Sequence, residues 1–365
     1  MKKRSLSTAR IVSQGFTLVE VMVAMVIGMI GLIVMMQVFS VAEGQRRTTT
    51  GSGDAQSNGA IALYALQRDI RQGGYGFNAL NAMGCPLTLP APASRTLTQL
   101  APVVINADVP AGDDNSDTLL VTFGNNEGPP EGDVVTAVNG SLIAVSTAVN
   151  YRVNQWVVAA PSAPLNGCAL TLAQVTAVAA PNVTIASSGA VDGGTLFNLG
   201  DNPRILAYAV RAGKLTVCDY RLADCGAACT AADDTCSASW VPIANDIVSL
   251  RAQYGHASTA TSGVDSWNQS TPEDDASQAA LACLWARTSA LRIAVVARNS
   301  QPDPNPLPVN EDEDHNDRPP LWAGSGGDGA PNIALSARAN WKNYRYKVFE
   351  TVIPLRNLPW MSACT

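Results

Sequence analysis

The fold of this chain is decided by the stretch Gln14-Gly15-Phe16-Thr17-Leu18-Val19-Glu20. A short basic leader precedes it, and an apolar run from Val21 to about Ala42 follows it directly. In an ordinary secretory signal the apolar segment is shorter and comes before a small-residue cleavage site. Here the small residue, Gly15, comes before the apolar run. Cleavage at this point would therefore leave the apolar run in the mature protein.

The apolar run is long enough to cross a membrane. As a helix, residues 16–42 would span about 40 Å at about 1.5 Å per residue, which exceeds the hydrocarbon core of a bilayer. No second apolar stretch approaches this length. The leader carries four cations, whereas the flank beyond the run carries Glu43, Arg46 and Arg47. Counting cations predicts a single span with a cytoplasmic leader and a periplasmic remainder.

One carboxylate, Glu20, lies at the start of this apolar helix. An ionised carboxylate inside a bilayer costs roughly 2.5–3.5 kcal/mol and usually has a functional partner. Cleavage after Gly15 would create an α-amino group on Phe16, about one helical turn from Glu20, and such a cation could pair with a carboxylate. In the alternative interpretation the segment is a plain anchor, and Glu20 lies among the lipid headgroups.

The whole string from Gly15 to Glu20 resembles the type III signal of type IV prepilins and pseudopilins. This resemblance implies that a prepilin peptidase cleaves between Gly15 and Phe16 and methylates the new amine of Phe16. It also implies that Glu20 neutralises the Phe16 amine of a neighbouring subunit during filament assembly.

The composition agrees with an exported protein. The formal net charge is −6, and loss of the leader removes four cations. No basic patch follows the apolar run, so nucleic acid is excluded as a partner. The length leaves room for one large or two small domains beyond the membrane.

Eight cysteines also indicate an oxidising compartment, because an even count outside the cytoplasm favours disulfides. Four of them are clustered: Cys218, Cys225, Cys229 and Cys236. A nested pairing of 218 with 236 and of 225 with 229 would staple a loop, but four cysteines allow three pairings and the sequence does not choose. Zinc is the alternative, although tight C-x2-C pairs and a nearby histidine are missing.

Beyond the membrane the chain is expected to continue as a helix to about residue 72. Ile61, Leu63, Leu66 and Ile70 recur at helical spacing, and Gly73-Gly74 ends the pattern. The stretch 48–58 is rich in Gly, Ser and Thr, which makes it the place where the helix is expected to loosen.

The rest of the chain predicts strands and loops. Short β-branched segments bounded by Gly, Asn or Pro predict strands at 118–123, 134–138, 142–145, 152–158, 206–211, 214–220, 247–254, 291–298 and 344–354. Ala212-Gly213 predicts a hairpin turn. Long loops are expected at 256–278 and 299–331, and the segment from about 85 to 200 carries no familiar pattern.

Four segments resemble PilW-type minor pilins, which are related to J-type minor pseudopilins. They are the helix end at 66–76, the strand at 246–255 and the closing strands at 290–298 and 344–357. The resemblance implies an α+β, pilin-like fold, with a long amino-terminal helix packed against a carboxy-terminal antiparallel β-sheet domain. The expected organisation is a leader at 1–15, a membrane and filament-core helix at 16–42, a periplasmic half-helix at 43–75 and a β-rich head at 76–365. The segment at about 85–200 is expected to be an insertion.

Motifs for catalysis are missing: the sequence has no H-E-x-x-H, no Walker lysine motif and no G-x-S-x-G, and no catalytic residue is predicted. Two acidic runs, 113–117 and 311–317, offer oxygen ligands that could suit calcium. Most acidic runs are simply solvated, so no cofactor is predicted.

Together these features predict a minor pilin of a type IV pilus that acts in the initiation of assembly and at the pilus tip, with roles in twitching motility and adhesion. The implied partners are a prepilin peptidase, other minor pilins, the major pilin, the inner-membrane assembly platform and a tip adhesin. The implied location is the inner membrane, with a periplasmic head, and then the filament. Two alternatives remain open: a J-like minor pseudopilin of type II secretion, and a membrane-anchored periplasmic binding or enzyme domain.

Overall fold

The computed structural model describes residues 15–125, 128–186, 190–226, 239–259, 262–273, 277–303, 306, 320–326, 330–359 and 364. The chain divides into two compact units, 1–51 and 52–365. Helix α1 (Leu18–Ile70) belongs to both units, and each unit is described by itself.

The part of α1 in the first unit is a bare apolar helix. Every side chain described from Phe16 to Val41 is exposed. The helix is long and apolar enough to cross a membrane by length and composition. Because no protein surface covers these side chains within the unit, an apolar environment outside the chain is needed to remove them from water.

The part of α1 in the second unit buries one stripe of side chains. The stripe consists of Ala55, Gly59, Ala62, Leu66 and Ile70, at the helical spacing of three and four residues. Its first three members are small, so the helix lies close to its neighbours there. The ring of Phe349 fills the space next to Gly59.

This packing corrects one prediction. Residues 48–58 were expected to loosen because of their Gly, Ser and Thr content, but all of them are helical. Ala55, a strong helix former, faces the core within this stretch, and Gly59 just beyond it lies against Phe349, so tertiary packing stabilises the helix here. Ile61, one of the residues of the predicted periodic pattern, is exposed.

The helix ends at Ile70, close to the predicted residue 72. The side-chain amide of Asn357 donates to the carbonyl oxygens of Arg71, Gln72 and Gly73 at 3.2–3.4 Å. These bonds satisfy carbonyl groups that no longer have a partner along the helix. Gly74 then turns the chain with a φ of +84°, in a position where a Cβ would overlap the carbonyl oxygen of Asn357.

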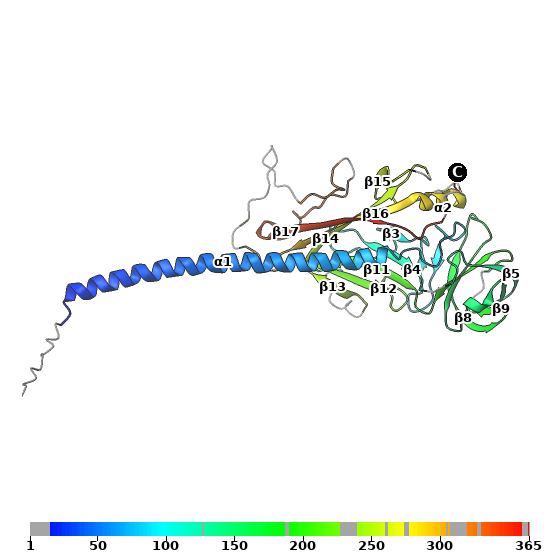
Figure 1. Ribbon diagram of the computed structural model, residues 1–365, viewed down its shortest axis with the longest axis horizontal. Coiled ribbons are helices and arrows are strands. Elements are labelled where there is room, and N and C mark those ends of the chain that lie inside the picture. The colour runs from blue at the N-terminus through cyan, green and yellow to red at the C-terminus, as the bar shows by residue number, and fades with distance from the viewer. Residues whose placement is uncertain are drawn as a thin grey trace, which may run out of the picture. The chain divides into compact units, whose positions relative to one another are not determined.

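Three sheets make up the rest of the second unit (Figure 1). The five-stranded sheet has the order β13-β12-β11-β4-β3, from Val241–Asn245, Lys214–Asp219, Arg204–Arg211, Leu119–Phe123 and Val103–Ile105. The four-stranded sheet has the order β15-β14-β16-β17, from Ser266–Asn268, Ile247–His256, Thr288–Arg298 and Tyr346–Pro354. Helix α2 (Gln278–Arg287) leads directly into β16.

The eight-stranded sheet has the order β2-β1-β8-β7-β10-β5-β6-β9. In that order its strands are Thr96–Leu97, Leu87–Thr88, Leu170–Ala179, Trp156–Ala160, Thr195–Gly200, Asp133–Asn139, Leu142–Val145 and Asn182–Ile185. The pair β1–β8 is parallel, and the other strand pairs of the three sheets are antiparallel. Figure 1 shows β5, β8 and β9 together at one end of the second unit.

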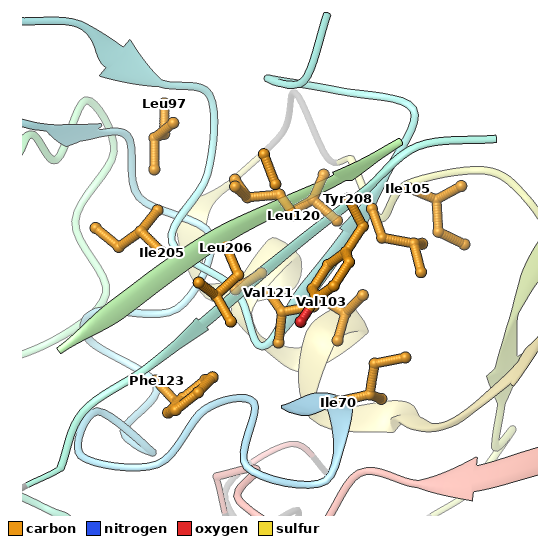
Figure 2. Close-up of a cluster of buried hydrophobic side chains, with 14 of the residues drawn as sticks. Ile70, Leu97, Val103, Ile105, Leu120, Val121, Phe123, Ile205, Leu206 and Tyr208 are labelled. Atoms are coloured by element: carbon orange, nitrogen blue, oxygen red, sulfur yellow. The ribbon is translucent and has the colours of Figure 1, made fainter. Parts of the chain in front are cut away.

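One large core joins the helix to the sheets. Figure 2 shows Ile70 of α1 beside Val103 of β3 and Tyr208 of β11, with the neighbouring apolar side chains of β4. Leu250 of β14 and Ile293 of β16 belong to the same buried cluster. The α+β, pilin-like architecture is thereby confirmed: a long amino-terminal helix is packed against antiparallel β-sheets that follow it in the chain.

Most predicted strands are present with shifted ends, and the hairpin at Ala212-Gly213 joins β11 to β12 with both residues at positive φ. The strand predicted at 152–158 begins only at Trp156. The loop predicted at 256–278 contains β15, and strands β1–β3, β8–β10 and β13 were not predicted. Most of the loop predicted at 299–331 lies outside the described residues.

Candidate functional site

The junction between Gly15 and Phe16 is the predicted processing point, and it lies just before α1. Both residues are exposed and non-helical, and Phe16 has 82 % of its surface accessible. Apart from its neighbours in the chain, no described residue has an atom within 4 Å of the place where a Cβ on Gly15 would be. The peptide bond between them is therefore open to an approaching protease. Residues 1–14 lie outside the described part of the chain.

Thr17 and Glu20 cap the start of α1 reciprocally. The backbone N–H of Thr17 donates to Glu20 Oε2 at 3.4 Å, and the backbone N–H of Glu20 donates to Thr17 Oγ1 at 3.3 Å. This is the capping-box arrangement, and it satisfies two N–H groups that lack partners along the helix. A carboxylate in the first turn also interacts favourably with the helix dipole.

The sequence already contains this cap as Thr-x-x-Glu, but the prediction considered for Glu20 only the Phe16 amine or the lipid headgroups and not the N–H of Thr17. Glu20 is exposed and its nearest polar partner is in its own chain. The carboxylate thus has a local role in the single chain, and its exposed oxygens remain accessible to a second partner.

At the other end of α1, Asp69 connects the helix to the five-stranded sheet. The buried hydroxyl of Tyr208 on β11 donates a short hydrogen bond to Asp69 Oδ2. Arg68 Nε donates to Asp69 Oδ1 at 2.8 Å, and this hydrogen bond raises the pKa of the guanidinium. Burial raises the pKa of Tyr208 far above its usual value, and the Asp69 charge adds to the effect. No pattern in the sequence indicates this pair, because the two residues are 139 positions apart.

Three disulfides are present among the described residues, which confirms the prediction of disulfides. Cys85 is joined to Cys168, Cys283 to Cys364, and Cys218 to Cys225. The last pair excludes the nested pairing, in which Cys218 would be joined to Cys236. Cys229 and Cys236 lie outside the described residues.

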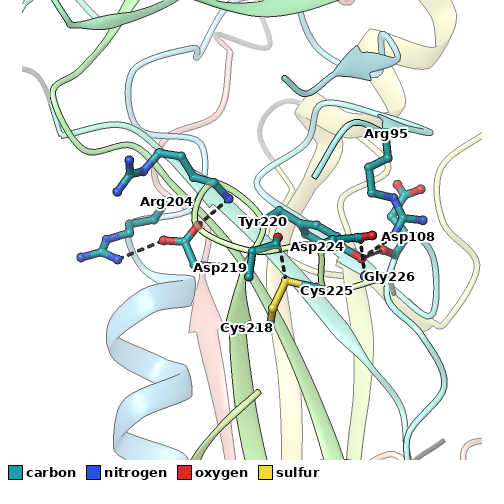
Figure 3. Close-up of a disulfide and its surroundings, with 11 residues drawn as sticks. Arg95, Asp108, Arg204, Cys218, Asp219, Tyr220, Asp224, Cys225 and Gly226 are labelled. Carbon is teal, nitrogen blue, oxygen red and sulfur yellow. Dashed lines mark hydrogen bonds and ion pairs between the residues drawn. A yellow bond between two sulfur atoms is a disulfide. The ribbon is translucent and has the colours of Figure 1, made fainter. Parts of the chain in front are cut away.

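The Cys218–Cys225 disulfide closes a short loop against the end of β12 (Figure 3). Tyr220 lies inside this loop; its hydroxyl donates to the carbonyl oxygen of Asp108 at 2.6 Å and accepts from Arg95 Nη1 at 2.7 Å. Burial raises the pKa of Tyr220 to about 12. The disulfide thus fixes the loop to β12, and the hydrogen bonds of Tyr220 fix it to the segment between α1 and β4.

The first acidic run serves the fold. Asp113 accepts from the backbone N–H groups of Ala212 and Gly213 at 2.8 and 2.9 Å. Asp117 is buried, pairs with Arg251 at 3.1 Å and accepts from three further donors. Their oxygens are thereby used in structural hydrogen bonds rather than being free for calcium. Within the described residues, no group of three or more His, Cys, Asp or Glu side chains is placed to hold a metal ion, and the run at 311–317 lies outside them.

His256 is the single histidine in the described part of the chain. Its Nδ1 lies 3.2 Å from Thr288 Oγ1 and its Nε2 lies 3.2 Å from Asn268 Oδ1. Both ring nitrogens therefore already have partners in the fold.

Two protein families match the chain. Residues 12–36 match the prokaryotic N-terminal methylation motif, and residues 221–357 match the type IV pilus-assembly protein W, PilW. Searches of curated proteins and of solved structures gave no match. The first match covers the exposed Gly15–Phe16 junction and Glu20, and the second covers β14, β16 and β17. Residues 221–357 are therefore identified with the PilW family of type IV pilus-assembly proteins, and the chain carries an N-terminal methylation motif.

Proposed function

We propose that this pilus-assembly protein is a minor pilin that helps to initiate the filament and remains at its tip. A prepilin peptidase would cleave the inner-membrane precursor between Gly15 and Phe16 and methylate Phe16. The periplasmic head would then associate with other minor pilins, the major pilin and the assembly platform, and present a surface to a tip adhesin. In this role the protein supports twitching motility and adhesion and catalyses no reaction.

The observation that carries the proposal is the arrangement of the first helix. An exposed Gly15–Phe16 bond precedes a capped helix whose side chains are exposed and apolar to Val41. Such a helix is stable only in lipid or among other apolar helices. Transfer from the membrane to a filament core exchanges one apolar environment for another.

Glu20 would direct this transfer. In a single chain its carboxylate bonds the N–H of Thr17. In the filament the carboxylate would also pair with the Phe16 amine of a neighbouring subunit. Because an unpaired buried carboxylate is costly, only the staggered arrangement that supplies this amine would be favourable.

The capping geometry makes a sharp experiment available. Glu20→Gln keeps an acceptor oxygen for the N–H of Thr17 but removes the charge, whereas Glu20→Ala removes both. We expect both variants to be inserted and cleaved, and both to be depleted from sheared filaments. Glu43→Ala is the matched control, because Glu43 is an exposed carboxylate on the same helix, paired with Arg47 at 3.2 Å. Normal incorporation of Glu20→Gln would show that capping, not charge, is what assembly requires.

A minor pseudopilin of type II secretion would have the same methylation motif. The match of residues 221–357 to PilW favours the pilus. The two machines are distinguished by deleting the assembly machinery of the pilus or that of the secretion system. The deletion that abolishes surface exposure of the protein identifies the machine to which it belongs. A tethered periplasmic binding or enzyme domain predicts that neither deletion has an effect.

A further inference from the structure

The chain leaves the five-stranded sheet and returns to it at the same place. Phe123, the last residue of β4, is the register partner of Arg204, the first residue of β11. Beyond this pair, the N–H of Asn125 donates to the carbonyl oxygen of Leu199 at 2.8 Å. Two antiparallel neighbours that a short turn would normally connect are thus separated by residues 124–203.

These residues form a closed barrel of six strands. Strand β5 pairs with β6, β6 with β9, β9 with β8, β8 with β7, β7 with β10, and β10 again with β5. Every one of these pairs is antiparallel. Register shifts interrupt β5, β8 and β10, and such bulges bend strands as closure requires. A closed ring leaves none of its six strands as a free edge, although β8 also pairs with β1 outside the segment.

The barrel has a hydrophobic core of its own, separate from the large core. It consists of Val135, Ile143, Val145, Ala148, Tyr151, Val157, Ala159, Ala173, Val175, Val183, Ile185 and Leu196. The hydroxyl of Tyr151 donates inside this core to the carbonyl oxygen of Leu196 at 2.8 Å. Asn198 donates to the carbonyl oxygen of Asn150 and to Gln155 Oε1 in the same region. The buried polar groups of Tyr151 and Asn198 are therefore satisfied from within the barrel.

One wall of the barrel packs on the rest of the protein. Along β7, Val157 and Ala159 point into the barrel core, whereas Val158 and Ala160 belong to the large core. This alternation is the two-residue period of a strand that is buried on both faces. Cys85–Cys168 and the pair β1–β8 fix the same wall to the segment after α1. The barrel is thus packed against the rest of the second unit, and its hydrophobic core stays separate from the large core.

Composition also sets the barrel apart. Between residues 128 and 200 the charged residues are Glu131, Asp133, Arg152 and Asp192, whereas 15 % of the whole chain is charged. The two family matches, 12–36 and 221–357, both leave the barrel out. The parts that define the family therefore lie on either side of it in the sequence.

We propose that residues 124–203 are an inserted β-barrel module that unfolds as a separate cooperative unit and is not required for processing or filament incorporation. Separate unfolding is inferred only from the closed ring of strands and from the hydrophobic core inside it. That the barrel is not required for processing or incorporation rests on the proposed function. In that case the helix and the other sheets assemble into the filament, and the barrel is the part of the head that is free for recognition.

Hydrogen exchange of the full-length protein in detergent, measured by mass spectrometry, tests whether the barrel unfolds as a separate unit. Ile143→Ala removes a fully buried side chain from the barrel core, and Ile293→Ala is the matched change in the large core. We expect Ile143→Ala to accelerate exchange at least about tenfold in β5–β10 and to leave β11, β14 and β16 unchanged. The control should accelerate exchange in β14, β16 and β17. Equal acceleration of β5–β10, β11, β14 and β16 by Ile143→Ala would overturn separate unfolding, and the milder Ile143→Val should give the same pattern if Ile143→Ala does not fold.

Whether the barrel is dispensable is tested by following cleavage of the Gly15–Phe16 bond and filament incorporation of the Ile143→Ala variant in cells. We expect both to match the unsubstituted protein. Loss of incorporation together with exchange confined to β5–β10 would overturn dispensability. Failure of the unsubstituted protein to enter filaments would instead refute the proposed function, and the exchange result would be unaffected.

Discussion

Asp69 of α1 and Tyr208 of β11 are hydrogen-bonded to each other in the core of the second unit, although 139 positions separate them in the chain. The bond fixes the last turn of the long helix to the middle of the five-stranded sheet. Asp69 is 3 % exposed and Tyr208 is 1 % exposed, so water does not replace either partner if the other is lost. Within the second unit, this contact holds the last turn of α1 against β11.

Tyr208→Phe should therefore destabilise the protein. The substitution leaves a buried carboxylate with one donor fewer, and the free energy of unfolding should fall by about 1–3 kcal/mol. Urea unfolding followed by tryptophan fluorescence measures this change. Tyr64→Phe is the control, because Tyr64 lies on the same helix and is 67 % exposed. A change below about 0.5 kcal/mol for Tyr208→Phe would contradict a stabilising role for the hydroxyl.

Alkaline pH should destabilise the head. Burial raises the pKa values of Tyr151, Tyr208 and Tyr254 far above the usual value. The folded state keeps these protons, whereas the unfolded state releases them above about pH 10. The stabilising contribution is complete below that pH, and the free energy of unfolding should fall as the pH rises toward the raised values. Urea titrations between about pH 8 and about pH 11 should show the decline, with a smaller slope for Tyr208→Phe. A constant free energy over this range would contradict the prediction.

Gly74→Ala should disrupt the end of α1. The residue has a φ of +84°, and a Cβ would overlap the backbone carbonyl of Asn357. Strain and overlap together should cost at least about 2 kcal/mol in the free energy of unfolding. Gly53→Ala is the matched control, because Gly53 is helical and nothing lies within 4 Å of its added Cβ. That control should be neutral or stabilising by up to about 1 kcal/mol. Equal effects of the two substitutions on the urea midpoint would contradict the assignment.

The disulfides should differ in what their removal costs. Cys283 and Cys364 are 81 positions apart, whereas Cys218 and Cys225 are 7 apart. Loop-closure entropy predicts losses of about 4.5 and about 2.5 kcal/mol for the paired serine substitutions. Urea unfolding of the two double variants tests the order. A larger loss for the short loop would show that local packing around Tyr220 outweighs chain entropy.

The elements that sequence reasoning found carry a local signal. Strands β4, β11 and β14 could be predicted from their β-branched content, and so could the turn at Ala212-Gly213 and the apolar helix with its stop at Gly73-Gly74. The barrel was partly missed: β7 begins at Trp156 rather than at residue 152, and β8–β10 were not predicted. The reversed expectation at 48–58 has a tertiary cause, because the helix packs on its neighbours through Ala55 and through Gly59 just beyond that stretch.

The residues of the candidate site also differ in whether a local sequence signal indicates them. Gly15, Phe16 and Glu20 could be singled out because their chemistry is local and is carried by one short string. The Thr17 cap was within reach of the same reasoning, because its signature is a spacing of three residues. Asp69 with Tyr208, and the closure of the barrel, depend on contacts between distant segments, for which one sequence supplies no period.

The most direct test of the pilin assignment is the mass of the amino-terminal peptide of the protein isolated from its native membrane. The account predicts an amino terminus at Phe16 that carries one additional methyl group. An uncleaved chain, in cells whose prepilin peptidase processes its other substrates, would contradict the account.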